Sequence, residues 1–325
     1  MKADMKETLN IHQNILERFQ TIGKKGFLAH AYLFIGPKEI GKSETALALA
    51  KTLNCEGAPQ PFFCDQCPSC LKITKGNHPD VHVIQSEEGT SAIKIGQVRE
   101  LLGQARLRPF EAKRKVFIIV NAEEMTPEGA NALLKTLEEP SATSVLLLTT
   151  SVPEKLLPTV RSRAQAVHFL SESNEKILQY LEGKYVESFS SSHFLSYFAE
   201  GCLSKAERLR EEGFFETKNE FLDEFLFKSD SEAFIKEMGA DKDKCGVFLK
   251  VLLSWVRDAM LCKAGVADNR LIHLDRKKDL EDFQVKFSIT QLNDIYASVV
   301  AAYKQLTDNL NIRMSLMILK ELVHG

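Results

Sequence analysis

The sequence predicts an α/β domain with a parallel sheet, followed by a region built of helices. Two observations support this. In residues 1 to about 168, short apolar runs alternate with helical patterns, which is typical of a parallel sheet covered on both faces. From about Phe214 onward, helical periodicity dominates and no run is convincing as a strand. The four apolar runs begin at Ala31, Asp80, Lys115 and Ser144.

The change in pattern predicts three parts. These are an α/β domain at 1–168, a small helical domain at 169–213 and an all-α domain at 214–325. The stretch Ser171–Glu172–Ser173 supplies a helix start signal for the second part, and Gly201 interrupts its pattern. The polar stretch 265–285 is expected to be a connection.

Composition and charge limit the function classes. The 325 residues are 44% hydrophobic and 26% charged, with a net charge of −2. A chain that grips DNA alone is normally more basic, so any DNA contact is expected within a larger assembly. No apolar run is long enough to span a bilayer, and Met1–Asn10 lacks the apolar block of a signal peptide. We therefore expect a cytoplasmic protein without membrane contact.

A phosphate-binding motif follows the first apolar run. Residues 36–43 read Gly-Pro-Lys-Glu-Ile-Gly-Lys-Ser, with Gly36, Gly41, Lys42 and Ser43 at the motif positions. Backbone N–H groups of such a loop surround phosphate oxygens, the lysine reaches the β and γ phosphates, and the serine can ligate Mg²⁺. Glu39 brings a carboxylate into the loop. Binding of ATP and Mg²⁺ is therefore expected to be weak, and a vestigial loop is an open alternative.

Four cysteines cluster in a segment at about 55–70. Cys55, Cys64, Cys67 and Cys70 have the spacing C-x8-C-x2-C-x2-C, which favours a closed tetrahedral site for structural Zn²⁺. A redox CxxC motif is the alternative. The other three cysteines have no metal spacing and are expected in the core: Cys202, Cys245 and Cys262. Three prolines in or beside the segment exclude a continuous helix: Pro59, Pro61 and Pro68.

Three further segments resemble one protein family. They are LAHAYLFIGP from Leu28, NALLKTLEEP at Asn131–Pro140 and TVRSRAQAVHF at Thr159–Phe169. With the four-cysteine segment, they resemble the δ′ and γ/τ clamp-loader subunits of bacterial DNA polymerase III over about residues 1–210. The resemblance implies a P-loop AAA+ domain, a helical lid and an all-α collar domain. It also implies γ/τ and δ subunits as partners, with the sliding clamp and primer–template DNA reached through the complex.

The resemblance favours a δ′-type subunit with little ATPase activity. Active AAA+ ATPases end the strand before the NALLK segment in Asp-Glu, where the carboxylates hold Mg²⁺ and orient water. Those positions fall here on Val120 and Asn121. Glu123 and Glu124 lie just past them, so a shifted register is an open alternative. In the lid, Ser204 stands where the ATPase subunits carry an arginine, beside Lys205.

The resemblance assigns the mechanistic role to Arg163. In the family, the arginine of this S-R-C segment reaches the ATP site of a neighbouring subunit as an arginine finger. Ala164 replaces the usual cysteine, and Arg161 is an alternative finger. The ordinary interpretation is that Arg163 only caps a helix or forms a salt bridge. The charged residues of the NALLK helix, Lys135, Glu138 and Glu139, fit a solvated face as well as they fit a contact.

Two other functions remain open at this point. One is an active γ/τ-type ATPase, which ATP turnover by the isolated chain would favour. The other is a zinc-dependent nucleic-acid-binding module with a relic phosphate loop. Salt-sensitive DNA binding by the isolated chain would favour it, whereas the net charge of −2 argues against it.

Overall fold

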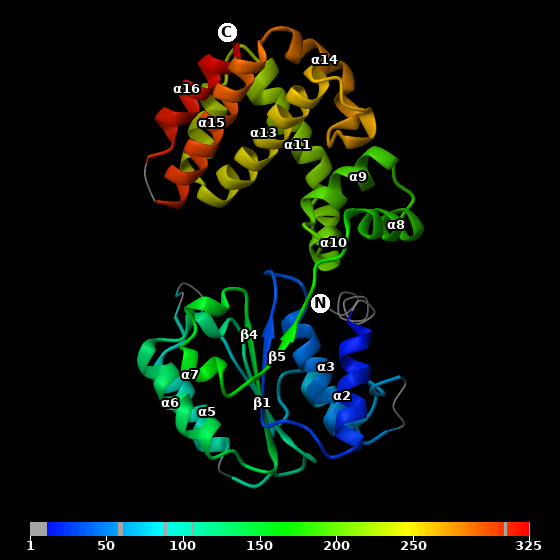
Figure 1. The fold of residues 1–325 in the computed structure, drawn as a ribbon, viewed down its shortest axis with the longest axis vertical. Coiled ribbons are helices and arrows are strands. Elements are labelled where there is room, and N and C mark those ends of the chain that lie inside the picture. Colours follow the sequence, from blue (N-terminus) through cyan, green and yellow to red (C-terminus); the bar gives the residue numbers. More distant parts are fainter. Residues whose placement is uncertain are drawn as a thin grey trace. The chain divides into compact units, whose positions relative to one another are not determined.

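The computed structural model describes residues 12–57, 61–87, 90, 92–105, 107–308 and 311–324. Met1–Asn10 and Pro59, which the sequence analysis used, lie outside these residues. The chain forms two compact units. The first contains residues 1–172 and 202–205, and the second contains residues 173–201 and 206–325 (Figure 1). The three-domain division stays a prediction.

A five-stranded parallel sheet forms the centre of the first unit, in the order β2-β3-β4-β1-β5. All four predicted strands are present, and Leu33 of β1 pairs with Leu148 of β4 and Ala166 of β5. The fifth strand was not predicted, because it is short and most of its side chains are exposed. The strands are β1 Ala31–Ile35, β2 Val81–Ile84, β3 Lys115–Ile119, β4 Ser144–Thr150 and β5 Gln165–His168.

Helices cover both faces of this sheet (Figure 1). Alternate strand residues point to opposite faces, as the period of two requires. Tyr32 and Phe34 pack into one core with α2 and α3, whereas Ala31 and Leu33 pack into the other with α5 and α6. The helices are α2 Gln13–Lys24, α3 Lys42–Asn54, α4 Pro68–Thr74, α5 Ile95–Ala105, α6 Pro127–Glu138 and α7 Pro158–Arg161, with the 3-10 turns η1 Ala122–Glu124 and η2 Pro153–Lys155.

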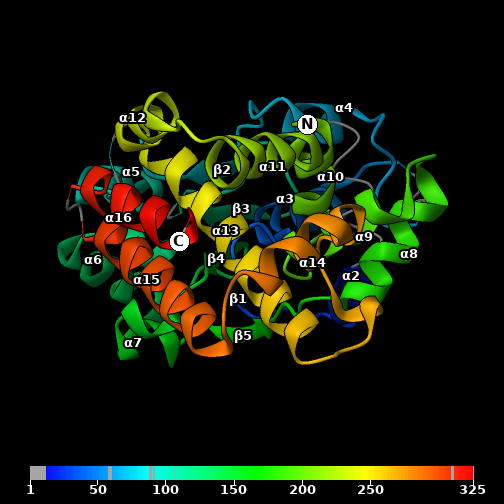
Figure 2. The ribbon, with the colours of Figure 1, turned by 90° about the horizontal axis from the view of Figure 1, so that it is seen from above.

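All the regular elements among the described residues of the second unit are helices, as predicted. Ser173 caps α8 by accepting the backbone N–H of Lys176, so the predicted start signal is confirmed. Figure 2 shows α15 and α16 side by side, with α13 next to α15. The helices are α8 Asn174–Lys184, α9 Phe189–Phe198, α10 Leu203–Glu211, α11 Phe214–Leu222, α12 Glu232–Ala240, α13 Lys242–Lys263, α14 Lys277–Val285, α15 Ile289–Thr307 and α16 Arg313–His324.

The stretch 265–285 is more ordered than the sequence suggested. Its last part is the helix α14, so the expectation of a connection was wrong from Lys277 onward. Upstream, Ile272 and His273 are buried. Their backbone N–H groups donate to the buried carboxylate of Asp258 in α13, at 2.6 and 2.8 Å. A buried acceptor on α13 thus holds a segment whose own composition is polar.

No helix among the described residues has the length and apolar character that crossing a membrane requires.

Candidate functional site

The phosphate-binding motif lies between β1 and α3, where the sequence placed it. Gly41 has a φ of 95° and is the N-cap of α3, so the loop turns through a conformation that favours glycine. Glu39 also has a positive φ, at 62°, which is uncommon for a residue with a side chain. Ser43 is half-buried in the first turn of α3. The first turn of the helix therefore faces the space where phosphate would bind.

Lys42 turns its ammonium group onto the loop itself. Its Nζ donates to the carbonyl oxygens of Gly36 at 2.9 Å and Pro37 at 2.6 Å, and the side chain is buried. Burial lowers the pKa of Lys42, and the carboxylates of Glu123 and Glu44 act against that shift. Lys42 must leave these carbonyls before it can reach a phosphate.

Gly36 has a second reason to be glycine. A Cβ at this position would lie 2.7 Å from the carbonyl oxygen of Phe169 and 2.8 Å from its Cβ. The chain leaving β5 therefore packs directly against the start of the loop. This packing requires glycine at position 36 whether or not a phosphate binds. Gly36 at its motif position is therefore no evidence for nucleotide binding.

The lid segment with the missing arginine lies against the loop. The thiol of Cys202 and the hydroxyl of Ser204 both donate to the carbonyl of Glu39. Burial raises the pKa of the Cys202 thiol, which keeps it protonated as a donor. Cys202 is buried as predicted, yet its contact with the loop was missed, because the two residues are 163 positions apart.

The positions of the expected carboxylates lie at the end of β3. Asn121 has a φ of 51°, and its backbone N–H donates to Thr149 Oγ1 at 3.0 Å. Its side-chain Nδ2 donates to Glu124 Oε1 at 3.2 Å. Glu124 also accepts the hydroxyl of Ser86 at 2.7 Å. Asn121 and Glu124 are therefore bound to each other, to Thr149 of β4 and to Ser86 just after β2.

Glu123 differs from Glu124 because one of its two carboxylate oxygens has no hydrogen-bond partner among the described atoms. Its Oε1 accepts the backbone N–H and the hydroxyl of Ser151, at 2.9 and 2.7 Å. Its Oε2 is buried and has no hydrogen-bond partner among the described atoms. Burial opposes ionisation, but hydrogen bonds from Ser151, from the backbone of Glu123 and from the side chain of Thr150 outweigh it and lower the pKa of Glu123. The structure thus places an ionised carboxylate near Lys42, at a position the sequence analysis kept as the shifted register.

The four predicted metal ligands come together. The sulfur atoms of Cys55, Cys64, Cys67 and Cys70 all lie within 4.8 Å of one another, and all four are free cysteines. Tetrahedral Zn²⁺ with bonds of about 2.3 Å places its sulfurs about 3.8 Å apart, so the cluster fits with a small contraction. The cluster can hold a metal ion.

The surrounding backbone is shaped for these sulfurs. The N–H groups of Cys64, Cys67 and Cys70 point at Cys55 Sγ, Cys64 Sγ and Cys67 Sγ, at 3.3 to 3.4 Å. Burial opposes the thiolate of Cys67, but backbone N–H groups outweigh it and lower its pKa to about 6. A Cβ at Gly57 would lie 2.8 Å from Cys64 Sγ, so only glycine fits there. We call residues 55–57 and 61–74 the cysteine module; residues 58–60 lie outside the residues that the structure describes.

In this structure Arg163 forms a salt bridge and a backbone hydrogen bond, as the interpretation without a finger role expects. Its Nη2 lies 2.8 Å from Glu138 Oε1 of α6, and its Nη1 donates to the carbonyl of Thr159 at 3.1 Å. The side chain is 36% exposed. Arg161 is exposed in the last turn of α7, and Ala164 packs into the core under α6.

Comparisons with known proteins identify the family. Residues 11–173 match the family model described as DNA polymerase III, delta subunit, and residues 212–324 match the model of its C-terminal part. The chain is 31% identical to the DNA polymerase III subunit delta′ of Bacillus subtilis over 325 residues, covering 96% of each chain. It is 42% identical to the delta′ subunit of Pseudomonas aeruginosa over 44% of this chain and 43% of that protein.

Other matches cover only part of the matched protein's length, or have a low TM-score. The tau subunit of Bacillus subtilis is 35% identical over 46% of this chain and 26% of its own length. A DNA polymerase III gamma subunit-related protein from Thermotoga maritima aligns over 95% of this chain and 98% of its own, with 18% identity and a TM-score of 0.45. The predicted α/β fold with a parallel sheet, followed by helical parts, is confirmed by the elements of the structure. By the whole-length match, the chain belongs to the family of DNA polymerase III delta′ subunits.

Proposed function

We propose that the chain acts as the δ′ subunit of a replicative clamp loader during DNA replication and hydrolyses little ATP itself. The observation that carries the second part is at the end of β3. Val120 and Asn121 occupy the positions of the ATPase carboxylates, and the Asn121 side chain is bound to Glu124. Neither residue can orient water as a carboxylate base does.

The proposed partners are the γ/τ ATPase subunits and the δ subunit, with the sliding clamp and primer–template DNA met through the complex. Membership of the delta′ family supports this set. The net charge of −2 supports DNA contact through the assembly and not by the chain alone. The proposed location is the cytoplasm.

The proposed role in catalysis belongs to Arg163. A guanidinium can direct two N–H donors at phosphate oxygens, and a neighbouring subunit would provide the nucleotide. The Glu138 pair is partly exposed, so its release costs at most about 1 kcal/mol. The chain can therefore exchange this partner for a phosphate of its neighbour.

The proposed metal is one structural Zn²⁺ held by Cys55, Cys64, Cys67 and Cys70. Four thiolate ligands leave no open coordination position, so the ion stabilises the fold and takes no part in a reaction. Elemental analysis of protein purified without chelator tests this, with about one equivalent of zinc expected. Absence of zinc, with disulfides between these cysteines, would remove the metal from the proposal.

ATP and Mg²⁺ are proposed to bind weakly, through Gly36, Gly41, Lys42 and Ser43. Lys42 must first give up two backbone carbonyls, which lowers the net gain from phosphate. Nucleotide titration of wild-type chain and Lys42→Ala measures this binding directly. Turnover by the isolated chain at the rate of an AAA+ motor would contradict the proposed function.

A second candidate is an active γ/τ-type ATPase, and Glu123 is the observation that favours it. Its buried Oε2 lacks a partner among the described atoms, and its charge acts on Lys42. If Glu123 serves as the base, Glu123→Gln abolishes turnover by the isolated chain. Glu124→Gln is the matched control, because Glu124 is bound to Asn121 and Ser86.

A further inference from the structure

The segment 107–112, called the display loop here, joins α5 to β3 and exposes a large aromatic side chain. Phe110 is 84% exposed and Leu107 is 57% exposed. The backbone of the loop is nevertheless held firmly. The N–H groups of Phe110, Glu111 and Ala112 donate to the carboxylate of Asp80 at 2.8 to 2.9 Å. Asp80 is fully buried, so these are charge-assisted bonds away from water.

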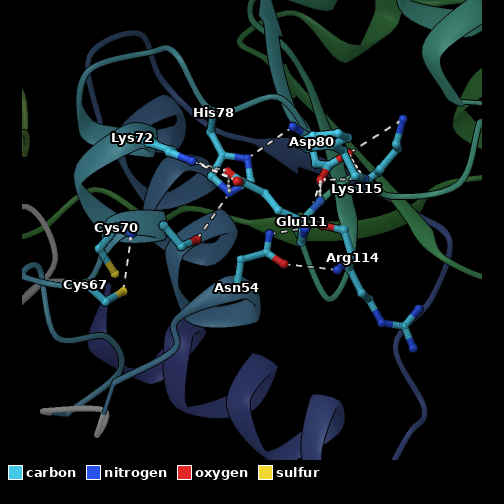
Figure 3. Close-up of polar contacts among 12 residues, drawn as sticks. Asn54, Cys67, Cys70, Lys72, His78, Asp80, Glu111, Arg114 and Lys115 are labelled. Atoms are coloured by element: carbon cyan, nitrogen blue, oxygen red, sulfur yellow. Dashed lines mark hydrogen bonds and ion pairs between the residues drawn. The ribbon is translucent and has the colours of Figure 1, made fainter.

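A buried histidine joins this carboxylate to the cysteine module. The backbone N–H of Asp80 donates to His78 Nδ1 at 3.1 Å. A neutral ring therefore carries its proton on Nε2, which lies 3.3 Å from Ser69 Oγ. Ser69 is in α4, between Cys67 and Cys70, and both Ser69 and His78 are buried. Figure 3 shows His78 between the module and Asp80.

The side chain of Glu111 gives a second link. Lys72, two residues after Cys70 in α4, donates through Nζ to both carboxylate oxygens of Glu111, at 2.8 and 2.7 Å. This pair is partly exposed and contributes little free energy by itself. Its geometry matters more, because it fixes the loop on the side facing the module (Figure 3).

The chain just after the display loop is held from the other end of the module. Lys113 Nζ donates to the carbonyl of Cys55 at 2.7 Å. The Asn54 side chain accepts the N–H of Arg114 and donates to its carbonyl, each at 3.0 Å. Residues beside the first and the last metal ligand therefore grip the same short segment, 111–114.

We propose that the cysteine module, with its metal bound, is the support that holds the display loop and presents Phe110 in one conformation. The inference rests on the proposed metal binding. The module buries the apolar side chains of Phe62, Phe63 and Ile73 in the core, and the metal ligation would add the cross-link that holds α4 in place beside them. Loss of the metal releases α4, and with it the contacts of Ser69 and Lys72.

Hydrogen exchange with and without metal tests this on the full chain. Zinc content is measured on the same samples before and after chelation. Removal of zinc should speed exchange of the Phe110, Glu111 and Ala112 amides by about tenfold or more. With zinc bound, the display loop can open only by breaking its contacts with an ordered module; without zinc, those contacts are already lost. The amides of β3 and β4 should keep their protection. Unchanged exchange in the loop, or loss of protection throughout the sheet, overturns the inference.

Two variants separate the link from the metal itself. His78→Phe keeps an aromatic ring at this position but removes the hydrogen bonds of His78 with the Asp80 N–H and with Ser69. It should loosen the display loop while about one zinc per chain remains. His30→Phe is the matched control: His30 lies just before β1, outside residues 78–82, and its Nε2 has no partner among the described atoms. A His78→Phe chain with zinc and a fully protected loop overturns the inference and leaves the metal proposal intact. Wild-type chain without zinc overturns both.

Discussion

The carboxylate of Asp80 should contribute more to stability than any other single charge at the edge of the sheet near β2. Its Oδ2 accepts the N–H groups of Phe110, Glu111 and Ala112, and its Oδ1 lies 3.7 Å from Lys115 Nζ. Asp80→Asn keeps the shape but leaves one acceptor oxygen. If that oxygen takes the Oδ2 position, the new NH₂ group faces the Lys115 ammonium, and two donors oppose each other.

The expected loss follows from these contacts. Breaking a buried ion pair costs about 3–5 kcal/mol, and hydrogen bonds to a charged group contribute about 1.5–3 kcal/mol each. Lys115 keeps one other acceptor, the carbonyl of Gln104 at 3.1 Å, and Asn retains one oxygen. We therefore expect a loss of about 3 kcal/mol in the free energy of unfolding of the first unit.

Urea unfolding followed by circular dichroism measures this loss. With a slope of about 3 kcal/mol per molar urea, the midpoint of the first unit should fall by about 1 M. Glu154→Gln is the control, because it removes an equal charge at an exposed position. If Asp80→Asn shifts the midpoint no more than Glu154→Gln does, the carboxylate does not hold the display loop as argued.

The same carboxylate predicts a pH dependence. Burial opposes its charge, but the backbone N–H groups of Glu111, Phe110 and Ala112, with Lys115, outweigh burial and lower the pKa of Asp80 below 3.8. Because the folded pKa is the lower one, the stabilisation is complete above the unfolded value and is lost as the pH falls through the folded value. The difference between wild type and Asp80→Asn should therefore shrink below about pH 4. An equal difference at pH 7 and pH 3 would contradict this.

Three further substitutions have expected outcomes. Gly57→Ala should weaken zinc binding by about tenfold or more in a chelator competition, because its Cβ would meet Cys64 Sγ at 2.8 Å. Gly36→Ala should cost about 1–3 kcal/mol in unfolding without nucleotide, because its Cβ would meet the chain leaving β5 at 2.7 Å. Glu138→Gln should change the free energy of unfolding by less than about 1 kcal/mol, because its pair with Arg163 is partly exposed.

Continuous apolar runs predicted β1, β3 and β4, because helices bury these strands on both faces of the sheet. The edge strand β2 is also an apolar run, although its Val83 is 44% exposed. The strand β5 has mostly exposed side chains, so neither an apolar run nor an alternation marks it. The cysteine cluster was predicted by spacing alone, since each C-x2-C spacing lets neighbouring thiolates converge on one ion. Apolar runs and residue spacing, which can be read from a short stretch of sequence, therefore predicted these strands and the cysteine cluster.

The sequence did not reveal what distant residues do to one another. Asp80 opens an apolar run and gives no sign that it accepts amides 30 positions later. Cys202 looked like a core residue, and its thiol lies on the phosphate loop. The free oxygen of Glu123 depends on how Ser151 is placed at the end of β4. Each of these depends on tertiary packing, which a lone residue in a sequence does not record.

The most direct test of the account is ATP hydrolysis by the reconstituted complex of this chain with its γ/τ and δ partners, clamp and primer–template DNA. Arg163→Ala should leave assembly intact in a pull-down, and should slow hydrolysis by about 1,000-fold or more at the one site that the arginine serves. Arg163→Lys should rescue only in part, because lysine lacks the forked donors. Arg161→Ala alone measures any contribution of Arg161, the exposed alternative finger. We expect a lower total rate with Arg163→Ala and almost no turnover by the chain alone. Unchanged hydrolysis by the complex, with Arg163→Ala and with the Arg161→Ala double variant, would contradict it.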